Sequence, residues 1–281
     1  MCDPASFVVT KGQVYWSHWS DRHDDIIGDN RLKDVDVRGN ATCVRIEISP
    51  PSGDLSLPPS KWKYKLDQDM KPTWYDAVAV ERRCRDALQA WRKQKLVLKG
   101  ERKITGREHV YVYGDGRVCL YGHKSRAKLY GNSSAELYSA SAADLYDTSS
   151  ADVFGEAWVM LYGSSFANLY GTSRSYIHGS SSVVLHYKSL ASLYGDSSAK
   201  LSDESSAILR NNSSAKLYHN SSAQLYGHSS ATLNHNTLAV LHRNASATSK
   251  SEYAVLVDRR GGGVPVCIVG EGELLAKEAT Q

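Results

Sequence analysis

The sequence has few features of a secreted, membrane-spanning or zinc-binding protein. It contains five cysteines in 281 residues, with no CxxC pair and no zinc spacing among them. Scattered cysteines of this kind indicate reduced thiols rather than a disulfide framework or a metal site. No apolar run reaches the length of a membrane span, and no basic stretch followed by an apolar core opens the chain. We therefore expect a cytoplasmic protein without membrane contact.

A charge excess of one sign is also missing. The chain has 34 Lys and Arg against 30 Asp and Glu. A nucleic-acid-binding protein usually shows a stronger basic excess or a dense basic run. Between Leu120 and Thr248, nine basic residues face eight acidic ones, so counterion release would contribute little to binding DNA. We expect no nucleic acid to bind through this segment.

Common catalytic motifs are missing as well. The chain contains no GxxxxGK[ST], HExxH or GxSxG motif. The run Gly261-Gly262-Gly263 has no following helix, which indicates a turn rather than a phosphate-binding loop. The sequence therefore predicts no cofactor, no metal and no identifiable catalytic residue.

What the sequence does contain is a repeat of eight residues. An aliphatic residue recurs at every eighth position, a small residue stands two positions before it, and usually a serine two before that. Small, small and large side chains at alternate positions are typical of a strand that turns them inward. The aliphatic positions are Leu129, Leu137, Leu145, Val153, Leu161, Leu169, Ile177, Leu185, Leu193, Leu201, Leu209, Leu217, Leu225, Leu233 and Leu241.

The positions between these residues indicate solvent-facing side chains and corners. One of them holds Glu136, Lys200 and Gln224 in different units, as a wet surface allows. Pairs such as Gly131-Asn132 and Asp147-Thr148 follow the aliphatic residue, and such residues tolerate positive φ. An eight-residue step fits neither a helix nor a pentapeptide solenoid. We predict one strand and one corner per unit.

Two units per coil is the simplest closure of such a chain. Leucine from one face would then meet serine or alanine from the other, whereas a three-faced coil would leave voids. The predicted fold class is mainly β: a two-faced β-solenoid of 16-residue coils, about seven of them, with a small α/β N-terminal domain. The domains are an N-terminal cap over 1–109, the solenoid over 110–248, and a C-terminal β-hairpin cap and tail over 249–281.

One of the two faces collects apolar replacements of polar residues. An exposed apolar patch usually marks a contact surface. The N-terminal segment could cover it, or a second copy or another protein could. The predicted interaction residues are Trp158, Met160, Tyr162, Tyr176, Leu190, Tyr194 and Ile208.

Outside the repeat the pattern is mixed. Strands are predicted at Thr42–Ser49 and Lys61–Leu66 and a helix at Tyr75–Lys93, whose apolar stripe includes Trp91. A short helix is predicted over Asp21–Asp29, with Asp21 as its N-cap. At the other end, two strands around the glycine run predict the hairpin: Tyr253–Asp258 and Val264–Val269.

Four segments carry a resemblance to a known family. HDDIIGDNRLKD (His23–Asp34), VRIEISPP (Val44–Pro51), DQDMKPTWYD (Asp67–Asp76) and VDRRGGGVPVCIVG (Val257–Gly270) resemble an uncharacterised family of phage and prophage proteins. Members join a small α/β domain to a short-period, serine-rich β-solenoid. The resemblance implies a phage product in the host cytoplasm, either associated with the virion or acting on the host. It assigns no activity to any residue.

Two function classes remain open. The first is a non-enzymatic structural or interaction protein, with the solenoid as a rigid support and the apolar face as contact surface. The second is a host-directed anti-defence effector or enzyme, for example one of ADP-ribosyl-transfer type, with its site in the N-terminal domain near His18 and His23. Asp203, His219 and His235 would share one corner in successive coils, but corner positions favour polar residues without any metal.

Overall fold

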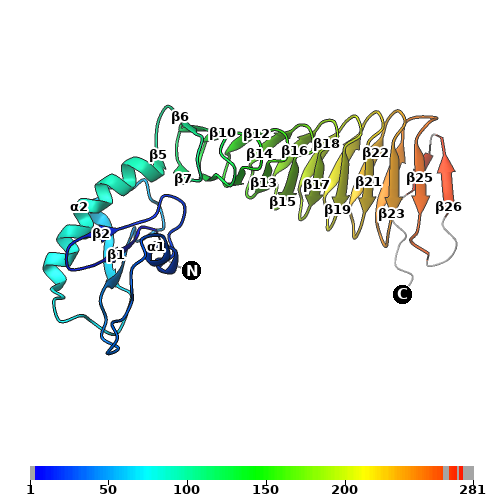
Figure 1. The fold of residues 1–281 in the computed structure, drawn as a ribbon. Coiled ribbons are helices and arrows are strands. Elements are labelled where there is room, and N and C mark those ends of the chain that lie inside the picture. The colour runs from blue at the N-terminus through cyan, green and yellow to red at the C-terminus, as the bar shows by residue number, and fades with distance from the viewer. Residues whose placement is uncertain (1–3, 262–265, 271, 275–281) are drawn as a thin grey trace. The chain divides into compact units, whose positions relative to one another are not determined.

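The computed structural model describes residues 4–261, 266–270 and 272–274. The chain divides into two compact units, which Figure 1 colours from blue to red along the chain. The first unit consists of Met1–Leu98 and Arg107–Tyr111, and the second of Lys99–Gly106 and Val112–Gln281. Within the described ranges, no helix is long and apolar enough to cross a membrane.

The first unit is built on a small antiparallel sheet with the strand order β2-β1-β3-β4. Every residue of the first strand, Ser6-Phe7-Val8-Val9, is buried, so this short segment forms the centre of the core. The elements are β1 (Ser6–Val9), β2 (Val14–Tyr15), α1 (His23–Asp29), β3 (Val44–Ser49), the 3₁₀ turn η1 (Pro59–Lys61), β4 (Lys63–Leu66) and α2 (Ala77–Lys95).

The strands predicted at Thr42–Ser49 and Lys61–Leu66 and the helix at Tyr75–Lys93 correspond to β3, β4 and α2, whereas β1 and β2 were not predicted. The predicted N-cap of α1 was wrong: the helix begins after Arg22, with no side-chain cap. Asp21 instead accepts a hydrogen bond from the hydroxyl of Tyr111, at 2.8 Å. The carboxylate that the local sequence assigned to the helix cap therefore binds a residue ninety positions further along the chain.

Helix α2 buries the stripe that its sequence predicts. Asp76 caps the helix by accepting from the amide of Ala79 at 3.0 Å. Two arginines of the helix, Arg85 and Arg92, are only partly exposed and donate to backbone carbonyls of residues 55–62. The buried apolar residues of the helix are Val80, Cys84, Leu88 and Trp91.

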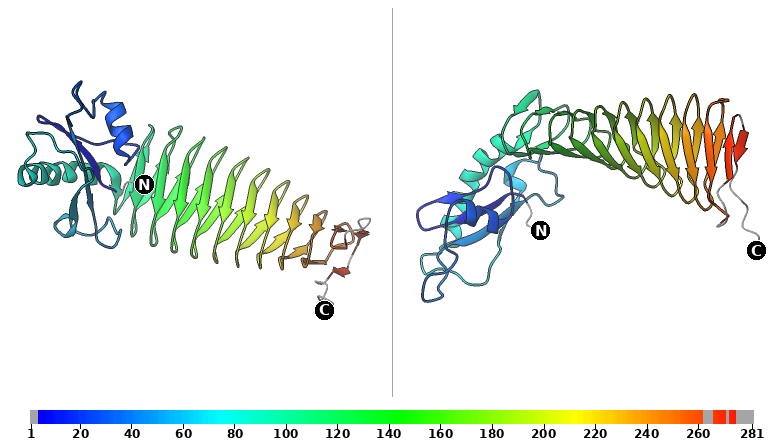
Figure 2. Two further views of the ribbon diagram at one scale, coloured as in Figure 1. Left: turned by 90° about the horizontal axis from the view of Figure 1, so that it is seen from below. Right: turned by 45° about the vertical axis from the view of Figure 1, so that its right-hand side comes forward.

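The second unit is the predicted two-faced β-solenoid. Strands alternate between two sheets, and successive rungs stack side by side (Figure 2). The sheets are called here the even sheet and the odd sheet after the numbers of their parallel strands, and each ends in one antiparallel strand, β27 and β26 respectively. The even sheet contains β6 (Glu101–Ile104), β8 (Arg117–Leu120), β10 (Ser134–Leu137), β12 (Ser150–Val153), β14 (Phe166–Leu169), β16 (Ser182–Leu185), β18 (Ser198–Leu201), β20 (Ser214–Leu217), β22 (Ser230–Leu233), β24 (Ser246–Ser249) and β27 (Gly272–Leu274).

The odd sheet runs from β9 to β26 within this unit. Its strands are β9 (Arg126–Leu129), β11 (Ala142–Leu145), β13 (Trp158–Leu161), β15 (Arg174–Ile177), β17 (Leu190–Leu193), β19 (Ser206–Leu209), β21 (Ser222–Leu225), β23 (Leu238–Leu241), β25 (Val255–Asp258) and β26 (Val266–Val269). Near the boundary between the two units lie β5 (Leu96–Val97) and β7 (His109–Val112).

Neighbouring strands pair in parallel at a step of sixteen residues, so Leu201 lies between Leu185 and Leu217. All three are fully buried, and each such leucine stabilises the fold by roughly 1.5–3 kcal/mol. The solenoid has about ten turns, more than the seven expected, because β6 already pairs in parallel with β8. These first rungs lack the serine and alanine columns, so their period was not visible in the sequence.

The corners follow the predicted chemistry. The first corner residue has positive φ, as at Asp147 (57°) and Gly163 (71°). Corners also stack closely: a Cβ on Gly163 would lie 3.2 Å from the backbone of Asp147. The buried serine after each corner can donate back across it, as Ser149 does to the carbonyl of Tyr146 at 2.7 Å. Serine therefore fills the narrow core, and in some units, such as those of Ser149 and Ser205, it also donates to a corner carbonyl.

The C-terminal end is closed by antiparallel strands, as predicted. Strand β25 continues the odd sheet in parallel with β23 and pairs antiparallel with β26. Strand β27 pairs antiparallel with β24 at the end of the even sheet. Most of the predicted Gly261–Gly263 turn, and the tail after Leu274, lie outside the described residues.

Candidate functional site

The predicted interaction residues lie together on the outer face of the odd sheet. Trp158 is paired with Arg174, and Met160 with Tyr176, on β13 and β15. The remaining members continue the same rows on β17 and β19 or directly follow these strands. Tyr176 is 45 % exposed and Leu190 39 % exposed, so the face presents apolar area to its surroundings. The register confirms that these side chains share a face, while their role in binding stays a prediction.

A column of stacked rings runs along one margin of this face. Tyr146, Tyr162, His178 and Tyr194 stack in sequence, with ring centroids 5.0–5.3 Å apart and planes within 10° of parallel. Arg210 continues the column, because its guanidinium lies 5.4 Å from the ring of Tyr194 and donates to its hydroxyl at 3.1 Å. Such stacking stiffens a row of side chains that would otherwise move independently.

An acidic residue interrupts the apolar rows. Asp144 pairs with Lys128 on one side and Met160 on the other. Burial raises the pKa of the Asp144 carboxyl, and the charges of Lys128 and Arg126 only partly oppose this shift. Burial likewise raises the pKa of Tyr146, so this end of the face is a poorly hydrated environment.

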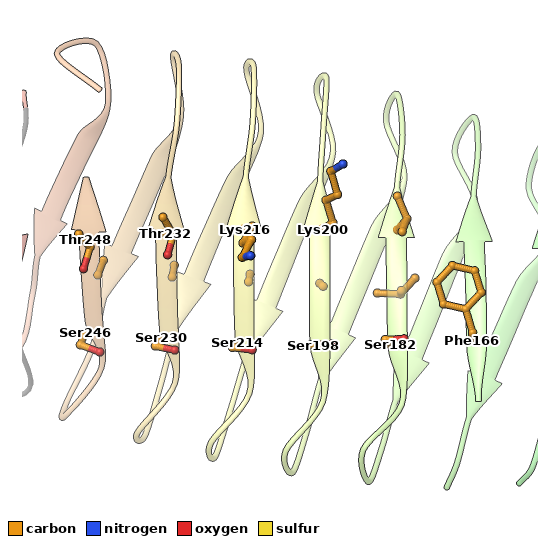
Figure 3. A pocket seen from close by; sticks show the side chains of 16 residues that line it. Phe166, Ser182, Ser198, Lys200, Ser214, Lys216, Ser230, Thr232, Ser246 and Thr248 are labelled. Carbon is orange, nitrogen blue, oxygen red and sulfur yellow. The ribbon is translucent and has the colours of Figure 1, made fainter. Parts of the chain in front are cut away.

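The even sheet carries a shallow groove of about 640 Å³ on its outer face. Figure 3 shows its serines in a row across successive strands, with Lys200 and Lys216 beside them and Phe166 at one end. None of the sixteen described residues that line it is acidic. This groove was not predicted from the sequence. The missed signal was the outward serine two positions before a lysine or threonine in alternate units: Ser198, Ser214, Ser230 and Ser246.

The two histidines predicted as weak polar candidates have separate environments in the first unit. His18 is exposed, lies 4.9 Å from the ring of Trp16 and contacts Gln94 through Nδ1. His23 is only 2 % exposed, and its Nε2 is 3.1 Å from the carbonyl oxygen of Ile46. The structure therefore places the two imidazoles in different surroundings.

His23 instead lies beside two carboxylates that sequence reasoning missed. Its Nδ1 is 3.5 Å from an oxygen of Asp67. Lys65 contacts both Glu47, at 3.1 Å, and Asp67, at 2.9 Å. His23, Glu47 and Asp67 form the one group with metal-binding potential within the described ranges. Predicting this group from the sequence would have required the antiparallel pairing of β3 with β4, which places Glu47 opposite Lys65.

The three corner residues considered as metal ligands, Asp203, His219 and His235, occupy equivalent corners of successive coils. His219 and His235 stack with centroids 5.1 Å apart, and both have positive φ. Asp203 accepts a hydrogen bond from the amide of Tyr187 instead.

Comparisons of the chain with protein-family models, curated proteins and solved structures found no match.

Proposed function

We propose that this chain is a non-enzymatic interaction protein, in which the solenoid is a rigid support and the apolar rows of the odd sheet contact a second copy or another protein. One observation carries the proposal: Trp158, Tyr176 and Leu190 lie in adjacent rungs of one face. Aromatic residues and methionine are enriched at the centres of protein interfaces. A rigid sheet also presents them without the entropy loss of ordering a loop.

The resemblance to phage and prophage proteins supplies the biological setting of the proposal. It supports a product in the host cytoplasm that either assembles with the virion or acts on a host protein. The near balance of charge along the solenoid supports a protein partner over nucleic acid.

The test compares matched pairs of substitutions on the two faces. Trp158→Ser with Leu190→Ser removes two apolar side chains from the odd sheet. Phe166→Ser with Val184→Ser is the control on the even sheet, where both side chains also face outward. We expect light scattering to show a wild-type oligomer that the first pair converts to monomer and the second pair leaves intact.

A monomeric wild type requires a second measurement. Proteins captured from infected or lysogenic cells should then be lost with the Trp158 and Leu190 pair and kept with the control pair. A monomer that captures the same proteins in all three forms would contradict the contact role of this face.

A second candidate is an enzyme with its active site in the first unit. It is favoured by the placement of His23, a buried imidazole, beside the carboxylates of Glu47 and Asp67. A host-directed activity of ADP-ribosyl-transfer type would be tested by incubating the protein with labelled NAD and host lysate. A His23→Gln variant that keeps the wild-type fold should then abolish label transfer.

A further inference from the structure

The polar group in the first unit comes from three separate elements. His23 begins α1, Glu47 lies in the middle of β3, and Asp67 directly follows β4. His23 and Glu47 are 2 % and 5 % exposed, while Asp67 is 34 % exposed. One ligand atom from each lies within 4.8 Å of the other two. Two buried ionisable side chains and one partly exposed side chain thus lie close together.

The hydrogen bond to Ile46 determines which imidazole nitrogen carries a proton. A carbonyl oxygen only accepts, so Nε2 of His23 must be the donor at 3.1 Å. In a neutral ring, Nδ1 then carries the lone pair, and this atom faces the Asp67 carboxylate. A lone pair facing a carboxylate is unfavourable unless a positive charge lies close by. In this structure the Lys65 ammonium, 2.9 Å from the other oxygen of Asp67, supplies that charge. A second proton on the ring or a metal ion between the two groups would supply it more directly.

The distance from Nδ1 to Asp67 favours the metal. A charged hydrogen bond from imidazolium to carboxylate is normally about 2.7–2.9 Å long. Two ligands of one tetrahedral zinc ion, with bonds of about 2.0–2.1 Å, lie about 3.3–3.4 Å apart. The separation here is 3.5 Å. His23 and Asp67 are therefore spaced as two ligands of a common ion are spaced, and the Glu47 carboxylate lies close enough to join them.

We propose that His23, Glu47 and Asp67 bind one divalent first-row transition metal ion, such as Zn²⁺. One imidazole nitrogen and two carboxylate oxygens suit these ions better than Ca²⁺ or Mg²⁺, which prefer oxygen ligands alone. The backbone carbonyl of Ile46 acts as the outer partner that orients a metal-bound histidine. The partial exposure of Asp67 leaves access for the ion and for a water ligand.

Lys65 is the competitor for this site. Its ammonium group contacts both carboxylates and neutralises part of their charge. The side chain is 62 % exposed, so it can swing into solvent when a dication takes its place. Metal binding therefore exchanges an ammonium for an ion of higher charge, and removing Lys65 should strengthen the binding of metal.

The experiment measures zinc binding to the full chain by calorimetry, with metal content by mass spectrometry after gel filtration. We expect one zinc ion per wild-type chain. Asp67→Asn should weaken binding by about tenfold or more, since even loss of an outer partner costs about 10–100-fold. Asp69→Asn, an exposed change two residues further on, is the matched control and should bind like the wild type.

Lys65→Met separates a metal site from a structural ion-pair cluster. We expect it to bind zinc more tightly than the wild type and to gain more thermal stability from added zinc. Circular dichroism checks that each variant is folded. Zinc binding that is equal in the wild type and Asp67→Asn, or absent from both the wild type and Lys65→Met, would overturn the proposal.

Discussion

The two units of this chain differ in where the contacts of a buried residue come from. In the solenoid, the neighbours of a residue lie sixteen positions away on either side, as Leu185 and Leu217 do for Leu201. In the first unit, neighbours come from unrelated places, as Ile46 and Asp67 do for His23. A repeated structure spreads its stability over equivalent contacts, whereas the first unit depends on single ones.

The largest expected effect comes from a charge in the leucine column. Leu201→Asp would place a carboxylate where no part of the side chain reaches solvent, at a cost of several kcal/mol. We expect this substitution to unfold the rungs around β18, detected as loss of the β signal in circular dichroism. Tyr218→Ser, at an outward position one coil further on, should be mild, and equal tolerance of both would refute the inward orientation of the column.

Trp91→Ala tests the single-contact character of the first unit. Trp91 is fully buried on α2, with its ring 6.1 Å from Trp62 and 6.2 Å from Tyr111. Loss of a buried tryptophan costs about 3–5 kcal/mol. We expect residues 4–98 to become sensitive to protease while the solenoid stays resistant. Simultaneous cleavage of both units would show that their stabilities are not separate.

The smallest expected effect distinguishes two serines of the same buried column. Ser205 donates to the carbonyl of Ser202 at 2.6 Å, whereas the hydroxyl of Ser197 has no hydrogen-bond partner among the described residues. Both are fully buried. Ser205→Ala should lower the free energy of unfolding by about 1 kcal/mol, and Ser197→Ala should change it little. Urea denaturation of both variants measures the difference, and equal losses would show that the corner bond is not stabilising.

The repeat made the solenoid predictable because its contacts follow a fixed step along the chain. Once the inward column around Leu201 was recognised, strand direction, the shared face of Trp158 and Leu190, and the positive-φ corners followed. The prediction failed where the step was hidden. The rung at β6 has the same register, but its sequence, Glu-Arg-Lys-Ile, shows no small residue at the inward position.

The first unit was predictable only where a signal is local. The apolar stripe of α2 and the proline-terminated strand β3 were visible in the sequence. The central strand β1 was not, because four residues carry too little periodicity to distinguish a buried strand from a loop. Asp21 was assigned to the helix nearest to it, and only the folded chain brings the hydroxyl of Tyr111 within its reach.

Spacing along the chain was enough to predict the two-faced β-solenoid, its inward leucine column and the face that gathers the apolar residues. Three features became apparent only in the folded chain: the carboxylates beside His23, the rungs that precede the visible repeat, and the groove on the even sheet. The group around His23 depends on pairings between segments at no fixed separation. The first rungs keep the step of sixteen but lack the serine and alanine columns that would reveal it, and the groove depends on the space left between outward side chains of several rungs. Nothing in the sequence around Glu47 or Asp67 indicates that either carboxylate lies beside His23.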